Sequence, residues 1–287
     1  MTILPSPAVP LISGFAEVNQ AQLYYEVMGA GYPLILIHAG IADRRMWDDQ
    51  FTFLAQYHRV IRYDVRGFGN SRTVETGGVT YSDHQDLYSL LKFLGVDRAF
   101  LLGVSNGGRI ALDFTLAYPS MVQALLPICS ALGGYEFTDE ATKQKDAAGD
   151  AALARGDIAQ AVELNLQLWV DGPGRTPEQI SPIVRERVRE MLTQLCHRSE
   201  DTGERQPLDP AAITRLNEIY VPTLVIIGDQ DVLDMLTIAD LLAAGISRAE
   251  KVIMPHVAHL PNLEKPEEFN QIVLDFLNRF KGDLYRG

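Results

Sequence analysis

Apolar and polar residues follow two rhythms along this chain, one typical of strands and the other of helices. Short continuous apolar runs suit strands that are covered on both faces of a sheet. The strands predicted in this way are residues 34–37, 59–63, 98–102, 124–128, 223–227 and 251–254. Before them, residues 15–27 alternate apolar and polar positions around Asn19 and Gln20, which predicts an antiparallel hairpin at the edge of the sheet.

Helical patterns lie between several of these strands. Apolar residues recur every three or four positions in residues 81–94 and 106–118, as on the buried face of an amphipathic helix. A last amphipathic helix is predicted through Phe269, Ile272, Val273, Phe276 and Phe280. Strands that alternate with helices in this way predict an α/β fold with a mostly parallel, doubly wound sheet.

The alternation stops in residues 133–216, where we find no convincing strand. Two helical faces are expected there, formed by Ile158, Val162, Leu166 and Trp169 and by Val184, Val188, Met191 and Leu195. A Gly-Pro-Gly break at residues 172–174 separates them. We therefore predict an α/β core made of residues 1–132 and 217–287, with residues 133–216 inserted as a helical cap that covers the edge of the sheet.

Composition narrows the classes of partner. The chain has 37 acidic against 25 basic residues, a net charge of -12, which argues against nucleic acid or an anionic membrane surface as the main partner. No apolar run approaches the roughly 18 residues that span a bilayer. Residues 1–15 contain three prolines and no basic region, so no secretory signal is predicted. We expect a cytoplasmic protein that acts on a small molecule, and assembly into a homo-oligomer stays open.

The two cysteines, Cys129 and Cys196, do not indicate a redox or metal function. They form no CxxC pair and have no histidine at the spacing of metal ligands. Two buried thiols are the simpler interpretation. We therefore expect neither a disulfide framework nor a metal site.

The strongest chemical signal is the G-x-S-x-G sequence around Ser105, directly between a predicted strand and a predicted helix. Small residues are needed there because a sharp turn must hold the serine hydroxyl above the carboxyl end of the sheet. A plain glycine turn and a phosphate loop are the competing interpretations. A dinucleotide site is disfavoured, because in Gly67-Phe68-Gly69-Asn70-Ser71-Arg72 the third glycine of that motif is replaced by arginine.

A serine hydroxyl is a weak nucleophile at neutral pH, so the hypothesis requires a base and an acid downstream. Asp231 lies just after the predicted strand 223–227, and His259 follows the last predicted strand. Asp229 is the second candidate for the acid and His256 the rival base. Asp229 is more readily explained by bonding within the turn, and Asp234 by capping the helix that begins near Met235.

The negative charge of an acyl-transfer intermediate needs two backbone donors. One is the N–H of the residue after the nucleophile, which is Asn106. The second comes from the loop after the strand 34–37, where we place it on Gly40, with Ala39 and Ile41 as further candidates.

Together these motifs resemble the α/β-hydrolase superfamily over nearly the whole chain. His38-Ala39-Gly40 resembles its oxyanion segment, with Ala39 where glycine is usual. Residues 64–71 resemble its Asp-x-Arg-Gly-x-Gly-x-Ser loop, residues 103–108 its nucleophile elbow, and Glu264-Lys265-Pro266 its E-x-P segment. The resemblance implies the α/β-hydrolase fold, a Ser105, Asp231, His259 triad and no cofactor.

Within the superfamily, details of the motifs favour an esterase or lactonase. Haloalkane dehalogenases and epoxide hydrolases use an aspartate where this chain has Ser105. Residues 43–48 resemble a segment of 3-oxoadipate enol-lactonases and small esterases. Carbon-carbon bond hydrolases of aromatic degradation commonly have asparagine where this chain has Val104, which weakens that assignment. An acyltransferase or perhydrolase with the same triad stays open, and so does a receptor on a hydrolase scaffold.

The cap is expected to select the substrate, because it would form the roof of the pocket. Trp169 in the cap, and Met46 and Trp47 after the oxyanion loop, are candidate substrate contacts, together with Ala39 and Ile41. Each of the two tryptophans has core packing as its competing explanation.

Overall fold

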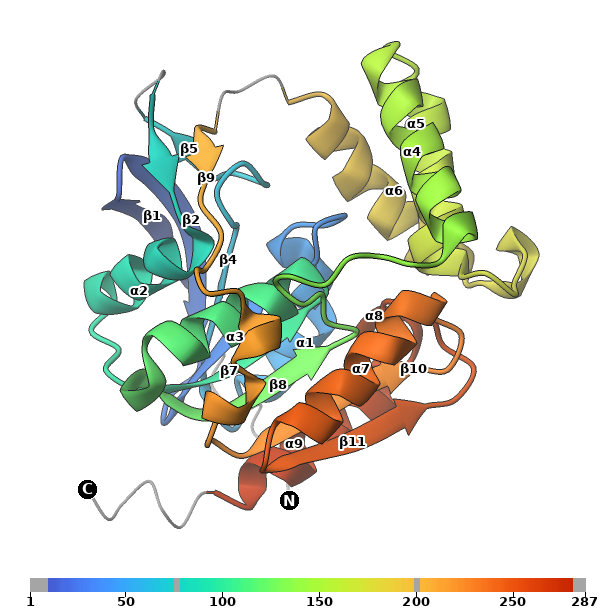
Figure 1. The fold of residues 1–287 in the computed structure, drawn as a ribbon. Coiled ribbons are helices and arrows are strands. Elements are labelled where there is room, and N and C mark those ends of the chain that lie inside the picture. The colour runs from blue at the N-terminus through green and yellow to red at the C-terminus, as the bar shows by residue number, and fades with distance from the viewer. Residues whose placement is uncertain (1–9, 75–77, 199–201, 281–287) are drawn as a thin grey trace, which may run out of the picture.

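The fold is built on one mostly parallel sheet, seen in the computed structural model, which describes residues 10–74, 78–198 and 202–280. The strands occur in the order β1-β2-β4-β3-β7-β8-β10-β11, with β5 beside β2 (Figure 1). Their bounds are β1 Ile12–Val18, β2 Ala21–Met28, β3 Pro33–Ile37, β4 Arg59–Tyr63, β5 Arg72–Thr73, β7 Ala99–Val104, β8 Val122–Ile128, β10 Thr223–Gly228 and β11 Ala249–Met254. Every strand predicted from an apolar run is confirmed.

The hairpin predicted at the edge of the sheet is also confirmed. β1 and β2 pair antiparallel in the register Val18 with Ala21, and Asn19 and Gln20 form the turn with positive φ. β2 pairs antiparallel with β4, whereas the strands from β4 to β11 are parallel to one another. Parallel strands place their carboxyl ends at one edge, which is where an α/β sheet binds its ligands.

Helices pack against the sheet. Their bounds are α1 Asp48–Leu54, α2 Asp83–Phe93, α3 Asn106–Ala117, α7 Leu233–Gly245, α8 Pro261–Glu264 and α9 Pro266–Asn278. α3 packs on β7 and β8, α7 packs on β10 and β11, and α1 packs on α9. Figure 1 shows α3 and α7 in front of the sheet and α1 behind it, so both faces are covered and the strands are almost entirely buried at the centre.

Between β8 and β10 the chain forms a separate group of helices, which stands away from the sheet in Figure 1. These are α4 Glu140–Ala154, α5 Ile158–Asn165, the π-helical segment Leu166–Asp171 and α6 Pro182–Cys196, and we call them the cap helices. The expectation of no strand in this part of the sequence is wrong at one place. β9 Glu204–Arg205 pairs with β6 Thr80–Tyr81, a two-residue pairing too short to leave a periodic signal.

The helix after β10 begins differently from the prediction. α7 starts at Leu233 with Val232 as its N-cap, so Asp234 is not the cap. Its carboxylate instead accepts hydrogen bonds from the chain that leads to the cap helices, namely from Tyr135 Oη and from the backbone N–H groups of Thr138 and Asp139. In the part of the chain that the structure describes, no helix has the length and apolar character needed to cross a bilayer.

Candidate active site

Ser105 occupies a strained turn between β7 and α3. Its φ of 56° and ψ of −116° lie outside the regions that side chains usually adopt. The turn can close because the residues two positions before and after Ser105 are glycines, which have no Cβ. A Cβ on Gly103 would lie 2.2 Å from the carbonyl oxygen of Gly107, and one on Gly107 would lie 2.2 Å from that of Ile37. This is the geometry expected of a nucleophile elbow.

Asp231 and His259 form a buried pair at the carboxyl ends of β10 and β11. His259 Nδ1 lies 2.9 Å from Asp231 Oδ2, and the histidine and the aspartate are 1% and 3% exposed. An ionised carboxylate only accepts hydrogen bonds, so Nδ1 donates and Nε2 is left free to accept a proton. The other Asp231 oxygen accepts the backbone N–H of Val232 at 2.8 Å, which fixes the carboxylate.

The competing acid and base point elsewhere. Asp229 is exposed, and its Oδ1 accepts Nε2–H of the next residue, Gln230, at 3.1 Å, which is the local bonding predicted for it. The same oxygen accepts the backbone N–H of His256, in the loop after β11, at 2.6 Å. His256 is itself exposed, with a φ of 60°. The structure therefore joins Asp231 to His259 and leaves the two rivals on the surface.

Cys129 connects the serine turn to the histidine loop. The backbone N–H of Ser105 donates to Ile128 O at 2.9 Å, and the next residue, Cys129, lies with its Sγ 3.8 Å from the carbonyl oxygen of Ala258. Ala258 directly precedes His259. The carboxyl ends of β7, β8, β10 and β11 thus bring the serine and the histidine loop to one edge of the sheet.

The loop after β3 lies against the first residue of α3. A Cβ on Gly40 would be 3.6 Å from Asn106 Cβ. The N–H of Ala39 is occupied, because it donates to Met46 Sδ at 3.2 Å. Among the described residues the N–H groups of Gly40 and Asn106 have no hydrogen-bond partner, which favours these two as the donors to an oxyanion.

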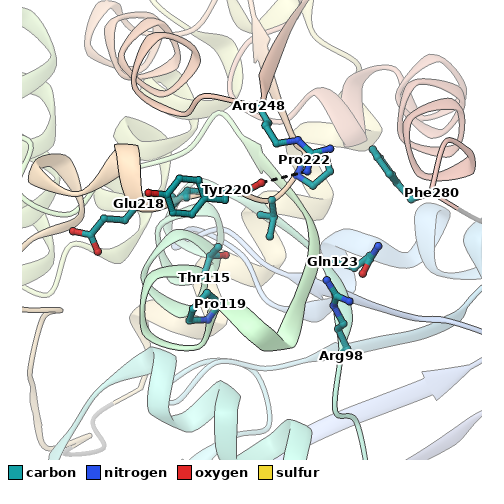
Figure 2. A pocket seen from close by; sticks show the side chains of 11 residues that line it. Arg98, Thr115, Pro119, Gln123, Glu218, Tyr220, Pro222, Arg248 and Phe280 are labelled. Carbon is teal, nitrogen blue, oxygen red and sulfur yellow. Dashed lines mark hydrogen bonds between the residues drawn. The ribbon is translucent and has the colours of Figure 1, made fainter. Parts of the chain in front are cut away.

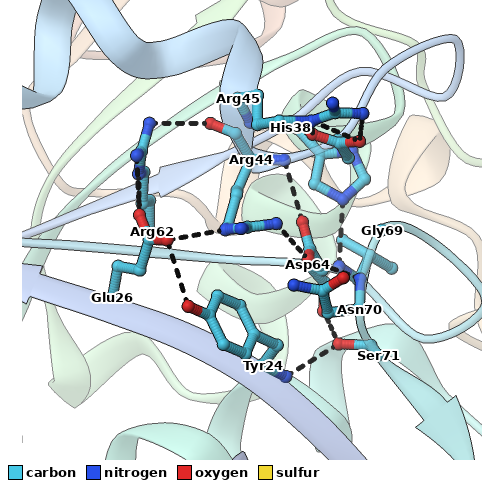
Figure 3. Close-up of polar contacts among 12 residues, drawn as sticks. Tyr24, Glu26, His38, Arg44, Arg45, Arg62, Asp64, Gly69, Asn70 and Ser71 are labelled. Atoms are coloured by element: carbon cyan, nitrogen blue, oxygen red, sulfur yellow. Dashed lines mark hydrogen bonds and ion pairs between the residues drawn. The ribbon is translucent and has the colours of Figure 1, made fainter. Parts of the chain in front are cut away.

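A buried polar network holds this loop in place. His38 Nε2 accepts the N–H of Val65 at 2.9 Å, and burial lowers the pKa of His38, which keeps the ring neutral for that role. Figure 3 shows Arg44 between two carboxylates, Glu26 at 2.9 Å and Asp64 at 2.8 Å. The Asp-x-Arg-Gly-x-Gly-x-Ser segment therefore supports the oxyanion loop through hydrogen bonds and ion pairs.

Arg109 on α3 is a member of the site that sequence analysis missed. Its Nε and Nη2 donate to Asn106 Oδ1 at 3.0 and 2.9 Å, and it forms ion pairs with Asp83 and Asp113. Burial raises the pKa of Asp113 to about 6, against which the Arg109 charge acts only in part. The spacing of Arg109 and Asp113, four residues apart on a helix, was the one local signal for this cluster.

The candidate substrate contacts divide into two groups. Met46 and Trp47 are fully buried, and Trp47 packs against Phe269 in the hydrophobic core, so the structure gives both side chains packing partners rather than open surface. Trp169 is half-buried and its ring centroid lies 4.7 Å from that of His259. Ala39 is buried and Ile41 half-buried beside Gly40.

Within the described residues one trio of side chains could be considered for a metal, namely Cys129, Asp231 and His259, whose ligand atoms lie within 4.8 Å of one another. Two of those atoms already share the His259 to Asp231 hydrogen bond. Burial raises the pKa of the Cys129 thiol well above its usual range, which disfavours the thiolate that a metal requires. This trio fits an acid–base pair better than a metal centre.

A hollow of about 250 Å³ lies at the opposite edge of the sheet from the candidate active site (Figure 2). Gln123 near the start of β8, and Pro222 and Arg248 just before β10 and β11, contribute to its lining, together with Arg98. These positions are at the amino ends of the strands, whereas Ser105, Asp231 and His259 follow carboxyl ends. The hollow is therefore separate from the candidate active site.

Comparisons with known proteins agree with this fold. A family model described as alpha/beta hydrolase fold matches residues 32–266. A 2-hydroxy-6-oxononadienedioate/2-hydroxy-6-oxononatrienedioate hydrolase of Paraburkholderia phymatum is 29% identical over 285 residues, which are 96% of each chain. Two solved structures are each 25% identical. A thermophilic esterase from Thermogutta terrifontis has a TM-score of 0.74, with 94% of this chain and 98% of that chain covered. Est816, an N-acyl homoserine lactone degrading enzyme, has a TM-score of 0.71, with 92% and 100% covered.

Proposed function

The chain belongs to the alpha/beta hydrolase fold family, and on that premise we propose that it is a serine hydrolase that cleaves a carboxylic ester or lactone of a small molecule. The observation that carries the proposal is the buried hydrogen bond between His259 and Asp231 at the edge of the sheet where Ser105 sits in its strained turn. This pairing leaves His259 Nε2 as a base, which a serine nucleophile requires.

The proposed reaction is a two-step acyl transfer. Ser105 Oγ attacks the carbonyl carbon of the substrate while its proton passes to His259 Nε2, and Asp231 stabilises the imidazolium. The N–H groups of Asn106 and Gly40 receive the negative charge on the carbonyl oxygen. The proton then moves from His259 to the leaving alkoxide, which departs and leaves an acyl group on Ser105. Water, deprotonated by His259, releases the acid and restores the serine.

The charges around the site favour an uncharged acyl group. Arg109, which contacts Asn106, is neutralised by Asp83 and Asp113, and Arg175, near the histidine loop, is neutralised by Glu264. A substrate carboxylate placed there would meet no unpaired cation from these two arginines. The relative from Paraburkholderia phymatum is named for dioate substrates, so carbon-carbon bond hydrolysis of such a dianion is the second candidate. The carboxylates of that substrate would need a cation as partner if they were buried in the site.

The cap helices are proposed to close the pocket over the site. Trp169 contacts the His259 ring, with the ring centroids 4.7 Å apart. Phe137 in turn contacts Trp169, with a centroid distance of 6.4 Å. Ile41 directly follows the Gly40 donor and is half-buried. Flat or apolar acyl groups would fit between these surfaces.

A matched pair of substrates tests the reaction and its charge preference together. We would compare p-nitrophenyl butyrate with mono-p-nitrophenyl succinate, which differs by one carboxylate, and add a small lactone. The wild type is expected to hydrolyse the neutral ester at least tenfold more efficiently than the anionic one, and Ser105→Ala is expected to lose several orders of magnitude in rate. Equal activity of Ser105→Ala and wild type would refute a serine nucleophile, and a preference for the succinate ester would refute the neutral acyl site.

Product analysis with added methanol or peroxide separates hydrolysis from acyl transfer, because a transferase would give the methyl ester or peracid instead of the acid.

A further inference from the structure

Arg175 lies at the junction between the cap helices and the catalytic loops. Two of its hydrogen bonds stay within the cap segment, since Nε donates to Asp171 O at 2.6 Å and Nη2 to Val170 O at 3.0 Å. A third reaches the histidine loop, where Nη1 donates to His256 O at 3.3 Å. The guanidinium also forms a two-pronged ion pair with Glu264, at 2.6 and 3.1 Å. All five N–H donors of the side chain are therefore used, and the two charged side chains are only 11% and 9% exposed.

Glu264 carries this connection to the residue before the base. Its Oε1 accepts the backbone N–H of Ala258 at 2.7 Å, in addition to the bond from Arg175. Ala258 directly precedes His259 in the chain. The carboxylate thus holds one side of the histidine loop, and Arg175 holds the carboxylate.

The cap and the catalytic loops also meet without spare room. Gly172, which ends the π-helical segment, has a φ of 79°, and a Cβ there would lie 2.4 Å from Gln230 O and 3.0 Å from Ala258 Cβ. Gln230 precedes Asp231. One turn of the cap therefore touches the acid loop and the base loop at once, and Trp169 in the same segment lies on the His259 ring.

We propose that Arg175 is a positioning residue, which fixes the cap segment to the histidine loop and so sets both the orientation of His259 and the contact of Trp169 with its ring. This inference rests on the proposed function, in which His259 is the base. Arg175 itself touches neither the substrate nor the reacting atoms in this scheme. A guanidinium suits the role because its planar fork satisfies a carboxylate and three carbonyl oxygens in one geometry, which a lysine cannot do.

Loss of Arg175 should change the charge near the base as well as its position. His259 is faced by the Asp231 carboxylate from the loop after β10, by the Cys129 thiol from the end of β8 and by the uncharged Trp169 ring from the cap. Without Arg175 the buried Glu264 carboxylate becomes an unpaired negative charge beside the histidine loop. A nearby negative charge stabilises a protonated imidazole relative to the neutral ring.

The two tryptophans make this measurable without any substrate. A protonated imidazole in contact with an indole quenches its fluorescence, and Trp169 is in contact with His259, whereas Trp47 is buried against Phe269. Fluorescence of the wild type followed against pH is expected to show a transition that Trp169→Phe abolishes. In Arg175→Met the transition should move to higher pH by about half a pH unit or more, or vanish if Trp169 and His259 are no longer in contact. In Arg175→Met/Glu264→Gln, which removes both charges, the midpoint should return toward that of the wild type.

Activity provides a second readout. Arg175→Met is expected to lower kcat by about tenfold or more while KM changes less, because misplacement of the base affects the chemical step. The matched control is Arg187→Met. Arg187 also joins a cap helix to the core, through an exposed ion pair with Asp49 at 2.7 Å, and its replacement should leave both the fluorescence transition and kcat unchanged. Arg175→Lys, which keeps the charge but not the fork, serves if the methionine variant fails to fold, and an intermediate kcat is expected.

The inference is overturned if Arg175→Met, or Arg175→Lys where the methionine variant does not fold, retains the wild-type transition and the wild-type kcat. It is also overturned if Arg187→Met shows the same changes as Arg175→Met, because a general loosening of the cap would then explain both. Failure of the proposed function looks different: Ser105→Ala would remain active. The fluorescence transition needs no turnover and decides the role of Arg175 in either case.

Discussion

Replacing Asp113 with asparagine should remove a pH dependence of stability that the structure assigns to this single buried carboxyl. The Asp113 side chain is 3% exposed, one of its oxygens accepts from Arg109 at 2.8 Å, and its other oxygen has no hydrogen-bond partner among the described residues. Burial raises its pKa from 3.8 to about 6. Between about pH 4 and pH 6 the folded chain then binds more protons at this group than the unfolded chain does.

The sign and the size of the effect follow from that difference. Because the folded state holds the extra proton, the contribution of Asp113 to the free energy of unfolding falls as pH rises through this interval. Above the interval that contribution is constant. A shift from 3.8 to about 6 corresponds to roughly 3 kcal/mol at most. The asparagine side chain is neutral at every pH, so in Asp113→Asn this part of the decline should be absent.

Urea unfolding of the two proteins at intervals from about pH 4.5 to 8 measures the difference directly. The stability of Asp113→Asn relative to wild type should rise by about 1–3 kcal/mol across this range, and other titrating groups cancel in the comparison. Asp97→Asn is the matched control, because the Asp97 side chain is 91% exposed, and its curve should run parallel to that of the wild type. Parallel curves for Asp113→Asn and wild type would refute the reasoning.

Three further variants test the site. Gly107→Ala should lower the free energy of unfolding by about 2 kcal/mol or more, because the new Cβ would lie 2.2 Å from Ile37 O, and an unchanged urea midpoint would contradict the tight elbow. Trp47→Ala should destabilise the protein by about 3–5 kcal/mol, whereas Trp169→Ala should mainly raise KM; thermal unfolding and steady-state kinetics separate them, and reversed effects would mean that the two roles are exchanged. Asp231→Asn should reduce kcat by several orders of magnitude, though less than Ser105→Ala, and full activity would remove Asp231 from the proposed triad.

The fold was predictable because its signals are local. β7 and β10, at the centre of the sheet, are mostly apolar and buried along their whole length, as expected for strands covered on both faces. The hairpin turn at Asn19 and Gln20 carries residues of positive φ in a polar break between two alternating segments. The glycines around Ser105 are equally local, since each removes a clash within the turn or with the strand beside it. Backbone geometry of this kind leaves its mark within a few consecutive residues.

Contacts between distant segments leave no such mark. Asp234 resembles a helix cap in sequence, yet its carboxylate bonds to Tyr135 and Thr138, almost a hundred residues earlier. In the sequence Arg109 does not differ from any other arginine on a helix. Its ion pair with Asp83 forms because α2 packs against α3. Met46 and Trp47 follow the oxyanion loop directly, and only the packing of α9 behind the sheet buries Trp47 against Phe269.

This distinction bears on where specificity arises. The proposed chemistry rests on Ser105 and on the pair formed by Asp231 and His259, which follow strands of the sheet. The parts that would choose a substrate depend on how the cap is attached. Arg175 and Glu264 are 89 residues apart, and each alone would be a buried charge without a partner, a state that costs several kcal/mol. The attachment of the cap to the histidine loop therefore depends on a pair of charges that only the fold brings together, and the residues around either one give no sign of it in the sequence.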